Sequence, residues 1–293
     1  MSFEKIDYFI ENEVRAFRFV MNMLECSMRE AQRYIDKQRL FCEGNIVSQK
    51  SLMIKGDISL VRFIPRTKGL KPIFQSNDFA LFDKPSGLLV HPKSRKTFYS
   101  LTDEVKYLFG NGANIVHRID KETSGLVLVA KHRNAEIFFK NAFQKKEIKK
   151  GYIALVKGKI DKELFINEPI KINRDYSEIK IKVFIDETGK KAQTIVKPLY
   201  YNKENNTTLV EALPLTGRQH QIRVHLFHMK HSILGDPIYG TDFQTASDYL
   251  DGKLGENERI KLTGAKRLML HANWIEFRYK NIFKIYTRKI FGS

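Results

Sequence analysis

One carboxylate, Asp120, stands among basic and turn-forming residues in the segment HRIDKETSGL, residues 117–126. An ionised carboxylate in such surroundings can act as a nucleophile or as a base. The apolar runs 114–119 and 126–130 on either side are typical of buried strands. We therefore expect Asp120 on a short loop held by a rigid sheet, where reactive groups are commonly placed. Taken alone, the residue would more simply be a turn aspartate paired with Arg118.

Four further stretches and a terminal LMLHA at 268–272 accompany this segment. The four are DKPSGLLVHP at 83–92, KKGYIALVKG at 149–158, LTGRQHQIRVHL at 215–226 and HSILGDPIYG at 231–240. Together they resemble the RluA family of RNA pseudouridine synthases, which place a nucleophilic aspartate at the position of Asp120. The resemblance covers roughly Ile73 to the C-terminus. Ile119 stands where the family usually has leucine, a swap that conserves side-chain volume.

The resemblance implies the conversion of uridine to pseudouridine in structured RNA. This reaction breaks the bond between uracil and ribose, rotates the base and rejoins it through ring carbon five, without redox change or energy input. The chain accordingly lacks the glycine-rich loops that hold nucleoside triphosphates or dinucleotides. We expect no cofactor.

An aspartate buried beneath a flipped base stays ionised at neutral pH only if a cation opposes the effect of burial. The family pattern places that cation in the motif 215–226, and Arg223 is our candidate. By the same resemblance, Tyr152 stacks on the target uracil and assists proton removal, and Arg118 helps to hold the nucleotide out of its stack. Without the motif, Tyr152 would be a core aromatic residue on a strand.

Thr216 and Gln219 have the spacing of a capping box, which predicts a helix beginning at Gly217. The free backbone N–H groups of that helix, flanked by Arg218, would suit an RNA phosphate. A surface helix with incidental arginines is the alternative.

Four histidines crowd one segment and raise the question of a zinc site: His220, His225, His228 and His231. Neither an H-E-x-x-H pattern nor a nearby thiolate accompanies them, so we expect no metal. Phosphate contacts or packing explain them better, and we assign His220 to the RNA-binding residues.

The charge balance favours a polyanionic partner. The chain has 51 Lys and Arg against 33 Asp and Glu, a net charge of +18, so nucleic acid is the first candidate and a membrane surface the alternative. No apolar run approaches the roughly 20 residues that span a bilayer, and the N-terminus lacks the pattern of a secretory signal. Cys26 and Cys42 are too few for a disulfide framework. We expect a cytoplasmic monomer.

Residues 1–64 are interpreted as a separate small module. Ser27 and Glu30 form a capping box that predicts a basic helix over SMREAQRYIDKQ, and a turn at 43–45 and short strands follow. This order is similar to the alpha-L RNA-binding fold, named after a small-subunit ribosomal protein, that precedes the catalytic domain in many RluA relatives. Its candidate RNA contacts are Arg29, Arg33 and Lys37.

The proline-rich stretch 65–72 predicts a linker. Beyond it, residues 73–293 mix strand and helix patterns without strict alternation, which favours an α+β fold. The resemblance implies that this second part is a catalytic domain built on the mixed sheet of pseudouridine synthases.

Two other classes of protein compete with an RluA-type enzyme. A catalytically silent ribosome-associated RNA-binding protein would not need the set of residues around Asp120. A metal-dependent nuclease would need clustered carboxylates, but Asp83 and Asp236 have the context of turn residues. Large-subunit ribosomal RNA is the favoured substrate because many ribosomal-RNA relatives carry an N-terminal module, and tRNA stays open.

Overall fold

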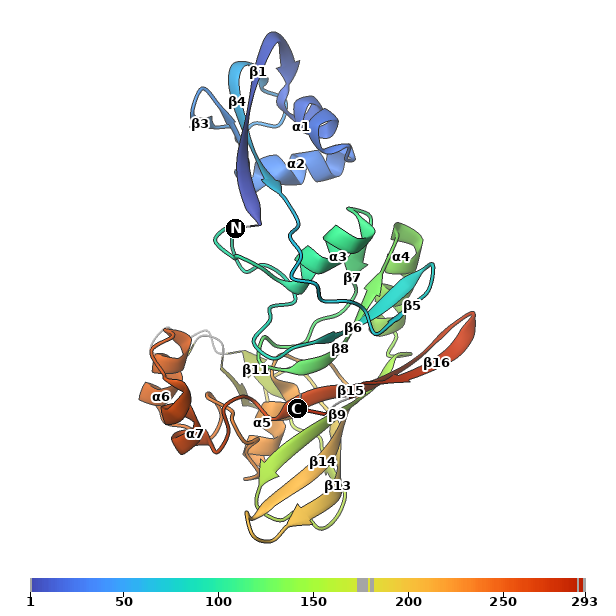
Figure 1. Ribbon diagram of the computed structural model, residues 1–293, viewed down its shortest axis with the longest axis vertical. Helices are drawn as coiled ribbons and strands as arrows, with labels where there is room; N and C mark the ends of the chain where they lie inside the picture. The colour runs from blue at the N-terminus through green and yellow to red at the C-terminus, as the bar shows by residue number, and fades with distance from the viewer. Residues whose placement is uncertain (1, 173–178, 180–181, 289, 292–293) are drawn as a thin grey trace. The chain divides into compact units, whose positions relative to one another are not determined.

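The computed structural model describes residues 2–172, 179, 182–288 and 290–291 (Figure 1). Contacts divide the chain into two units. One comprises Met1–Lys68 with Pro92–Asp103, and the other comprises Gly69–His91 with Glu104–Ser293. The first division falls inside the stretch 65–72, but residues 92–103 join the first unit although they follow a catalytic-domain motif in the sequence.

The first unit is a four-stranded antiparallel sheet with two helices. Its strands lie in the order β1 (Phe3–Arg15), β4 (Met53–Phe63), β2 (Leu40–Cys42) and β3 (Asn45–Ile46). The helices are α1 (Ala16–Leu24) and α2 (Met28–Asp36), and they pack with the sheet around a core that includes Phe19, Ile35 and Leu60. The predicted capping box is confirmed, because the side chains of Ser27 and Glu30 each accept a backbone N–H from the other residue.

The long strand β1 was absent from the sequence-based prediction. Ile6, Tyr8 and Ile10 are half-buried, whereas the residues between them are exposed. This period of two marks a half-buried strand. The exposed Phe9 hid the pattern, because it places an apolar residue between Tyr8 and Ile10 where a polar one is expected.

The returning segment 92–103 is tied to the first unit by polar contacts. Arg95 Nη2 donates to the carbonyl oxygen of Gln38 at 2.7 Å and also to that of Lys37, just past the end of α2. Ser2 Oγ donates to the carbonyl oxygen of Phe98 at 3.0 Å. A guanidinium at the C-terminus of a helix satisfies carbonyl groups that have no partner within the helix.

The second unit is built on a ten-stranded mixed sheet. Its main path runs in the order β10 (Leu164–Ile166), β13 (Thr194–Asn202), β14 (Thr207–Pro214), β9 (Lys149–Lys157), β15 (Leu270–Tyr279), β8 (Ser124–Ala130), β6 (Phe79–Lys84) and β5 (Phe74–Gln75). Strand β7 (Asn114–Ile115) pairs with β8, and β16 (Asn281–Tyr286) pairs with β15. The predicted α+β class is confirmed.

The sheet is mixed because β8 and β15 run parallel, with Gly125 opposite Ala272, whereas its other described pairings are antiparallel. Gly125 has φ +107°, and a Cβ there would lie 2.3 Å from the carbonyl oxygen of Ala272. Only glycine accommodates that backbone conformation and that close approach. The glycine of the TSGL sequence therefore brings the start of β8 against β15.

Helices of the second unit pack against its strands. The apolar side chains Ala135, Phe139 and Ala142 of α4 (Arg133–Gln144) pack in one core with β6, β8 and β15. Helix α5 (Gln221–His228) packs through Val224 against the ribbon of β11 (Ile170–Ile172) and β12 (Val183–Ile185). The remaining helices are α3 (Leu101–Phe109), α6 (Phe243–Leu250) and α7 (Glu256–Thr263), of which α6 and α7 stand beside each other in Figure 1.

Candidate active site

Asp120 lies on the loop between β7 and β8, and 22% of its side chain is exposed. The strand predicted over 114–119 is shorter than expected and ends at Ile115. One cause is His117, whose Nε2 accepts the backbone N–H of Leu128 at 2.9 Å in place of a ladder partner. The chain then leaves the sheet as an irregular loop that is still flanked by buried apolar residues, Val116 and Ile119.

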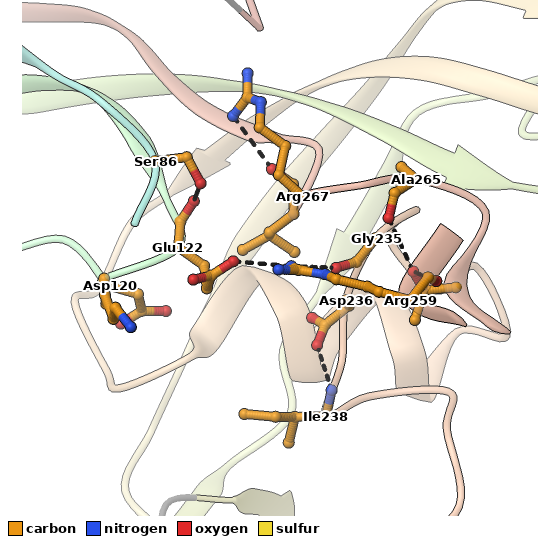
Figure 2. A network of polar contacts seen from close by, with 12 residues as sticks. Ser86, Asp120, Glu122, Gly235, Asp236, Ile238, Arg259, Ala265 and Arg267 are labelled. Atoms are coloured by element: carbon orange, nitrogen blue, oxygen red, sulfur yellow. Dashed lines mark hydrogen bonds and ion pairs between the residues drawn. The ribbon is translucent and has the colours of Figure 1, made fainter. Parts of the chain in front are cut away.

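The turn of the DKPSG motif holds this loop from one side. Ser86 Oγ donates to the carbonyl oxygen of Glu122 at 2.6 Å (Figure 2), and the backbone N–H of Gly87 donates to that of Lys121 at 2.9 Å. The fully buried ammonium of Lys84 donates to the Lys121 carbonyl as well, at 3.0 Å. Burial lowers the pKa of Lys84 to about 7, against the attraction of nearby carboxylates. The position of Asp120 is therefore fixed by backbone contacts on its C-terminal side.

Arg223, on α5, forms the ion pair with Asp120 that the sequence led us to expect. Its Nη1 lies 3.4 Å from Asp120 Oδ2. Its Nε and Nη2 each lie 2.7 Å from one oxygen of Asp236, so the second pair is bidentate. Burial opposes the charge of Arg223, but the two carboxylates raise the pKa of its guanidinium above the ordinary value.

Asp236 is a buried counter-ion, which corrects its interpretation as a simple turn residue. Its Oδ1 also accepts the backbone N–H of Ile238 at 2.9 Å (Figure 2) and that of Tyr239 at 3.0 Å. Burial favours the neutral acid, but Arg223 and these hydrogen bonds lower the pKa of Asp236 below its ordinary value. The available signal in the sequence was that Asp236 is the acidic residue of the motif at 231–240.

The predicted helix start at Gly217 is wrong, because α5 begins at Gln221. Thr216 Oγ donates to Gln221 Oε1 at 2.7 Å, and the backbone N–H of Arg218 donates to the same oxygen at 3.0 Å. The side chain of Gln221 thus holds residues 216–220 in a loop. The loop ends at His220, the N-cap residue of α5, which has the left-handed φ of 51° and makes no side-chain cap hydrogen bond. The backbone N–H of Arg218, one of the donors expected to face a phosphate, is therefore occupied within this loop.

His220 lies inside the site, where 9% of the residue is exposed. Its Nδ1 is 3.1 Å from the hydroxyl of Tyr239, and its Nε2 is 3.8 Å from Asp120 Oδ2. Burial and the charge of Arg223 lower the pKa of His220 to about 4. The imidazole is therefore neutral at pH 7 and adds no positive charge for a phosphate.

Tyr152 is buried on β9, between β14 and β15. Burial and the negative charge of Asp120 raise the pKa of its phenol far above the ordinary value. The hydroxyl is therefore protonated at neutral pH, and the ring presents an aromatic surface that stays uncharged.

These side chains meet in one cavity of about 580 Å³. Asp120, Tyr152, His220 and Arg223 all line it. Such a volume falls in the range of sites for small ligands. The structure thus brings the three predicted catalytic candidates to a single concave site.

Cations stand around the same cavity. Arg118 and Arg218 line it and are exposed, and Arg218 Nε donates to the Lys191 carbonyl oxygen at 3.1 Å. Lys146 and Lys150 also line it and were missed in the sequence. The lysine-rich sequence 145–150, which runs into the start of β9, was the available signal, but scattered lysines elsewhere in the chain obscured it.

Arg29, Arg33 and Lys37 belong to the first unit and do not line the cavity. All three are exposed and follow one another at a spacing of four along and just beyond α2. This spacing places them on one face of the helix. They form a basic stripe, which is a separate feature from the cavity.

Two of the other three crowded histidines have protein partners. His225 bonds Thr194 Oγ at 2.9 Å and the Glu168 carbonyl at 3.0 Å, and His231 bonds the Lys157 carbonyl at 2.9 Å. Among the described residues no group of three or more His, Cys, Asp or Glu side chains could hold a metal ion. Packing accounts for both histidines.

Known proteins resemble this chain over most of its length. A sequence model of the family described as RNA pseudouridylate synthase matches residues 78–228. An uncharacterized RNA pseudouridine synthase of Helicobacter pylori is 39% identical over 96% of this chain and 93% of its own. The ribosomal large subunit pseudouridine synthase C of Vibrio parahaemolyticus is 30% identical over 95% and 86%. The mitochondrial tRNA pseudouridine(32) synthase of Saccharomyces cerevisiae is 34% identical over 60% and 38%.

The fold has a solved counterpart as well. Human RNA pseudouridylate synthase domain containing 1 matches 77% of this chain and 86% of its own, with a TM-score of 0.60 and 24% identity. The fold of this chain is therefore similar to that of a solved pseudouridylate synthase domain.

This chain belongs to the RNA pseudouridine synthase family, and the predicted RluA type is confirmed. It is an isomerase that acts on uridine in RNA, and its relatives include enzymes named for the ribosomal large subunit and for tRNA. In the part of the chain that the structure describes, no helix is both long enough and apolar enough to cross a membrane.

Proposed function

We propose that this synthase isomerises a specific uridine in large-subunit ribosomal RNA and that Asp120 is its nucleophile or base. The observation that carries the role of Asp120 is its contact with the buried Arg223 inside a cavity of about 580 Å³. Asp236 already pairs with the Arg223 guanidinium through two hydrogen bonds. A second carboxylate at Arg223 is therefore not needed to balance its charge in the fold.

The unequal distances from Arg223 suit a reacting carboxylate. Asp236 binds the guanidinium through both oxygens at 2.7 Å, whereas Asp120 lies at 3.4 Å and is partly exposed. Arg223 therefore pairs with Asp120 through one carboxylate oxygen and leaves the other oxygen unoccupied by this guanidinium. One carboxylate holds the arginine, and the other stays available to the substrate.

The remaining candidates fit the handling of an extruded nucleotide. A base must leave its stack before the glycosidic bond can be reached, at a cost of a few kcal/mol. Stacking on the buried ring of Tyr152 would return about 1–3 kcal/mol. Arg118 and Arg218 stand exposed at the cavity, where they would bind the phosphates of the extruded and neighbouring nucleotides.

Ribosomal RNA is the favoured substrate. The Vibrio relative that is named for the large ribosomal subunit aligns with 95% of this chain, whereas the yeast tRNA relative aligns with 60%. The first unit, which carries the basic stripe Arg29, Arg33 and Lys37, would add contacts to a large RNA. The alternative substrate is tRNA.

The test is a map of pseudouridine in the total RNA of a strain that lacks this protein, compared with its parent. We expect one or a few sites to vanish from large-subunit ribosomal RNA. The wild-type gene should restore them, and a gene carrying Asp120→Asn should not. Loss of sites in tRNA alone would assign the enzyme to tRNA, and an unchanged map would support an RNA-binding protein without activity.

A further inference from the structure

Arg259, on α7, bridges two segments that carry the site. Its Nη2 donates to Glu122 Oε2 and to the carbonyl oxygen of Gly235, both at 2.8 Å (Figure 2). Glu122 is two residues beyond Asp120, and Gly235 directly precedes Asp236. One guanidinium therefore joins the loop of one carboxylate to the turn of the other.

The Arg259–Glu122 pair is shielded from water. Each of the two side chains is 12% exposed, and the Arg259 guanidinium lies 5.3 Å from the centre of the Tyr249 ring. Burial raises the pKa of the Glu122 carboxyl, but Arg259 and Tyr249 more than offset this and hold that pKa below its ordinary value. A shielded pair of this kind is little screened by salt.

Helix α7 is itself fixed to the same turn. The backbone N–H of Gly235 donates to the Thr263 carbonyl oxygen at 3.0 Å, at the end of α7. Gly235 has φ +74°, and a Cβ there would lie 1.8 Å from the Arg267 carbonyl oxygen. A residue with a side chain does not fit this position, so the turn and α7 stay in close register.

The two segments must keep a fixed separation because Arg223 contacts a carboxylate from each. Its bidentate pair with Asp236 uses Nε and Nη2, and the third nitrogen, Nη1, donates to Asp120. If the loop of Asp120 moved relative to the turn of Asp236, Arg223 would follow Asp236 and lose Asp120.

We propose that Arg259 is a positioning residue, which holds Asp120 at the distance where the Arg223 guanidinium donates a hydrogen bond to it. The inference rests on the proposed role of Asp120. Arg259 lies outside the part of the chain that matches the family model, residues 78–228. By this inference, helix α7 supports the active site through the Glu122–Arg259 pair.

The first arm of the test is independent of the substrate. Hydrogen–deuterium exchange compares the wild type with Arg259→Ala and with Lys261→Ala, which removes an exposed cation from the same helix. We expect faster exchange in peptides that cover 117–124 and 233–239 for Arg259→Ala alone. Unchanged exchange in both peptides would overturn the inference.

The second arm is kinetic and uses an RNA that the wild type modifies. Arg259→Ala should lower kcat by about ten- to a hundredfold with little change in KM, because misplacement of a reacting group by about 1 Å has such an effect. Glu122→Gln, which keeps the side-chain shape, should lower kcat in the same direction and serves if Arg259→Ala does not fold. Guanidinium chloride should restore part of the kcat of Arg259→Ala, whereas sodium chloride at equal ionic strength should not.

A kcat within twofold of the wild type in folded Arg259→Ala, or a rise in KM alone, would contradict the inference. Its failure differs from failure of the proposed function. If Asp120→Asn kept its kcat, the role of Asp120 would fall, whereas the exchange comparison would still decide whether Arg259 holds the two segments.

Discussion

The guanidinium of Arg223 is almost fully buried, so carboxylates must balance its charge. Asp236 does so with two short hydrogen bonds, and Asp120 adds a longer one. The contact of Arg223 with Asp120 was predictable from the motifs, because an aspartate beneath a base needs a cation. Asp236 was not, because a turn aspartate and a buried counter-ion have the same sequence context.

Asp236→Asn should destabilise the protein by about 3–5 kcal/mol at neutral pH, because it leaves Arg223 without its bidentate partner. The pKa of Asp236 is lowered in the folded state, so its contribution is present above the ordinary aspartate pKa of about 3.9 and is lost as pH falls through the lowered value. Urea unfolding near pH 7 and pH 3 should show the difference between wild type and variant shrinking in acid. A difference that is constant with pH would contradict this role.

Substitutions of Tyr152 test its contribution to RNA binding apart from the chemical step. Because burial raises the pKa of its phenol, the ring is uncharged, and Tyr152→Phe keeps the stacking surface. We expect Tyr152→Phe to bind RNA as the wild type does and Tyr152→Ala to lose about 1–3 kcal/mol of affinity. Filter binding on an inactive Asp120→Asn background measures this without turnover. Equal affinities for the two variants would argue against stacking.

At the scale of elements, the motif loops depend on strands whose existence was predictable and whose ends were not. The strand pattern at 126–130 corresponds to β8. The early end of β7 depends on the imidazole of His117, and the late start of α5 depends on the side chain of Gln221. Both are side-chain contacts with backbone or turn atoms, which residue spacing does not reveal.

Gly125→Ala should destabilise the second unit by about 2–4 kcal/mol, because alanine is strained at φ +107° and its Cβ would meet the backbone of Ala272. The matched control is Gly112→Ala, where a Cβ would lie 3.9 Å from its nearest neighbour and the backbone needs no glycine. Thermal melts should show a lower Tm for the first variant and little change for the second. Equal Tm values would contradict the close approach of β8 and β15.

At the scale of the whole molecule, the charge composition predicted an RNA partner and the motifs predicted the pseudouridine synthase family. Neither predicted which residues belong to each of the two units. Residues 92–103 follow a catalytic-domain motif yet pack with the first unit through Arg95 and Phe98. These contacts join residues more than fifty positions apart. The sequence around residues 92–103 does not indicate which distant residues they contact.

Replacement of the basic stripe Arg29, Arg33 and Lys37 by glutamine tests the first unit without deleting it. If the stripe binds phosphates, affinity should fall and the slope of log affinity against log salt should flatten by about 0.7–0.9 per lost contact. The control replaces the exposed Lys230, Lys253 and Lys261 of the second unit, with the same change in charge. Identical slopes for both triple variants would remove the stripe from the RNA interface.

The role of Asp120 is tested most directly by release of tritium from carbon five of uracil in a labelled RNA substrate. Asp120→Asn keeps the side-chain shape but supplies neither an anionic nucleophile nor a base. The control Asp251→Asn removes an exposed carboxylate that does not line the cavity. We predict that release falls below detection in Asp120→Asn, with RNA affinity within about twofold of the wild type because phosphate and stacking contacts supply most of it. Release from Asp120→Asn at a rate near that of the wild type would contradict the proposed mechanism.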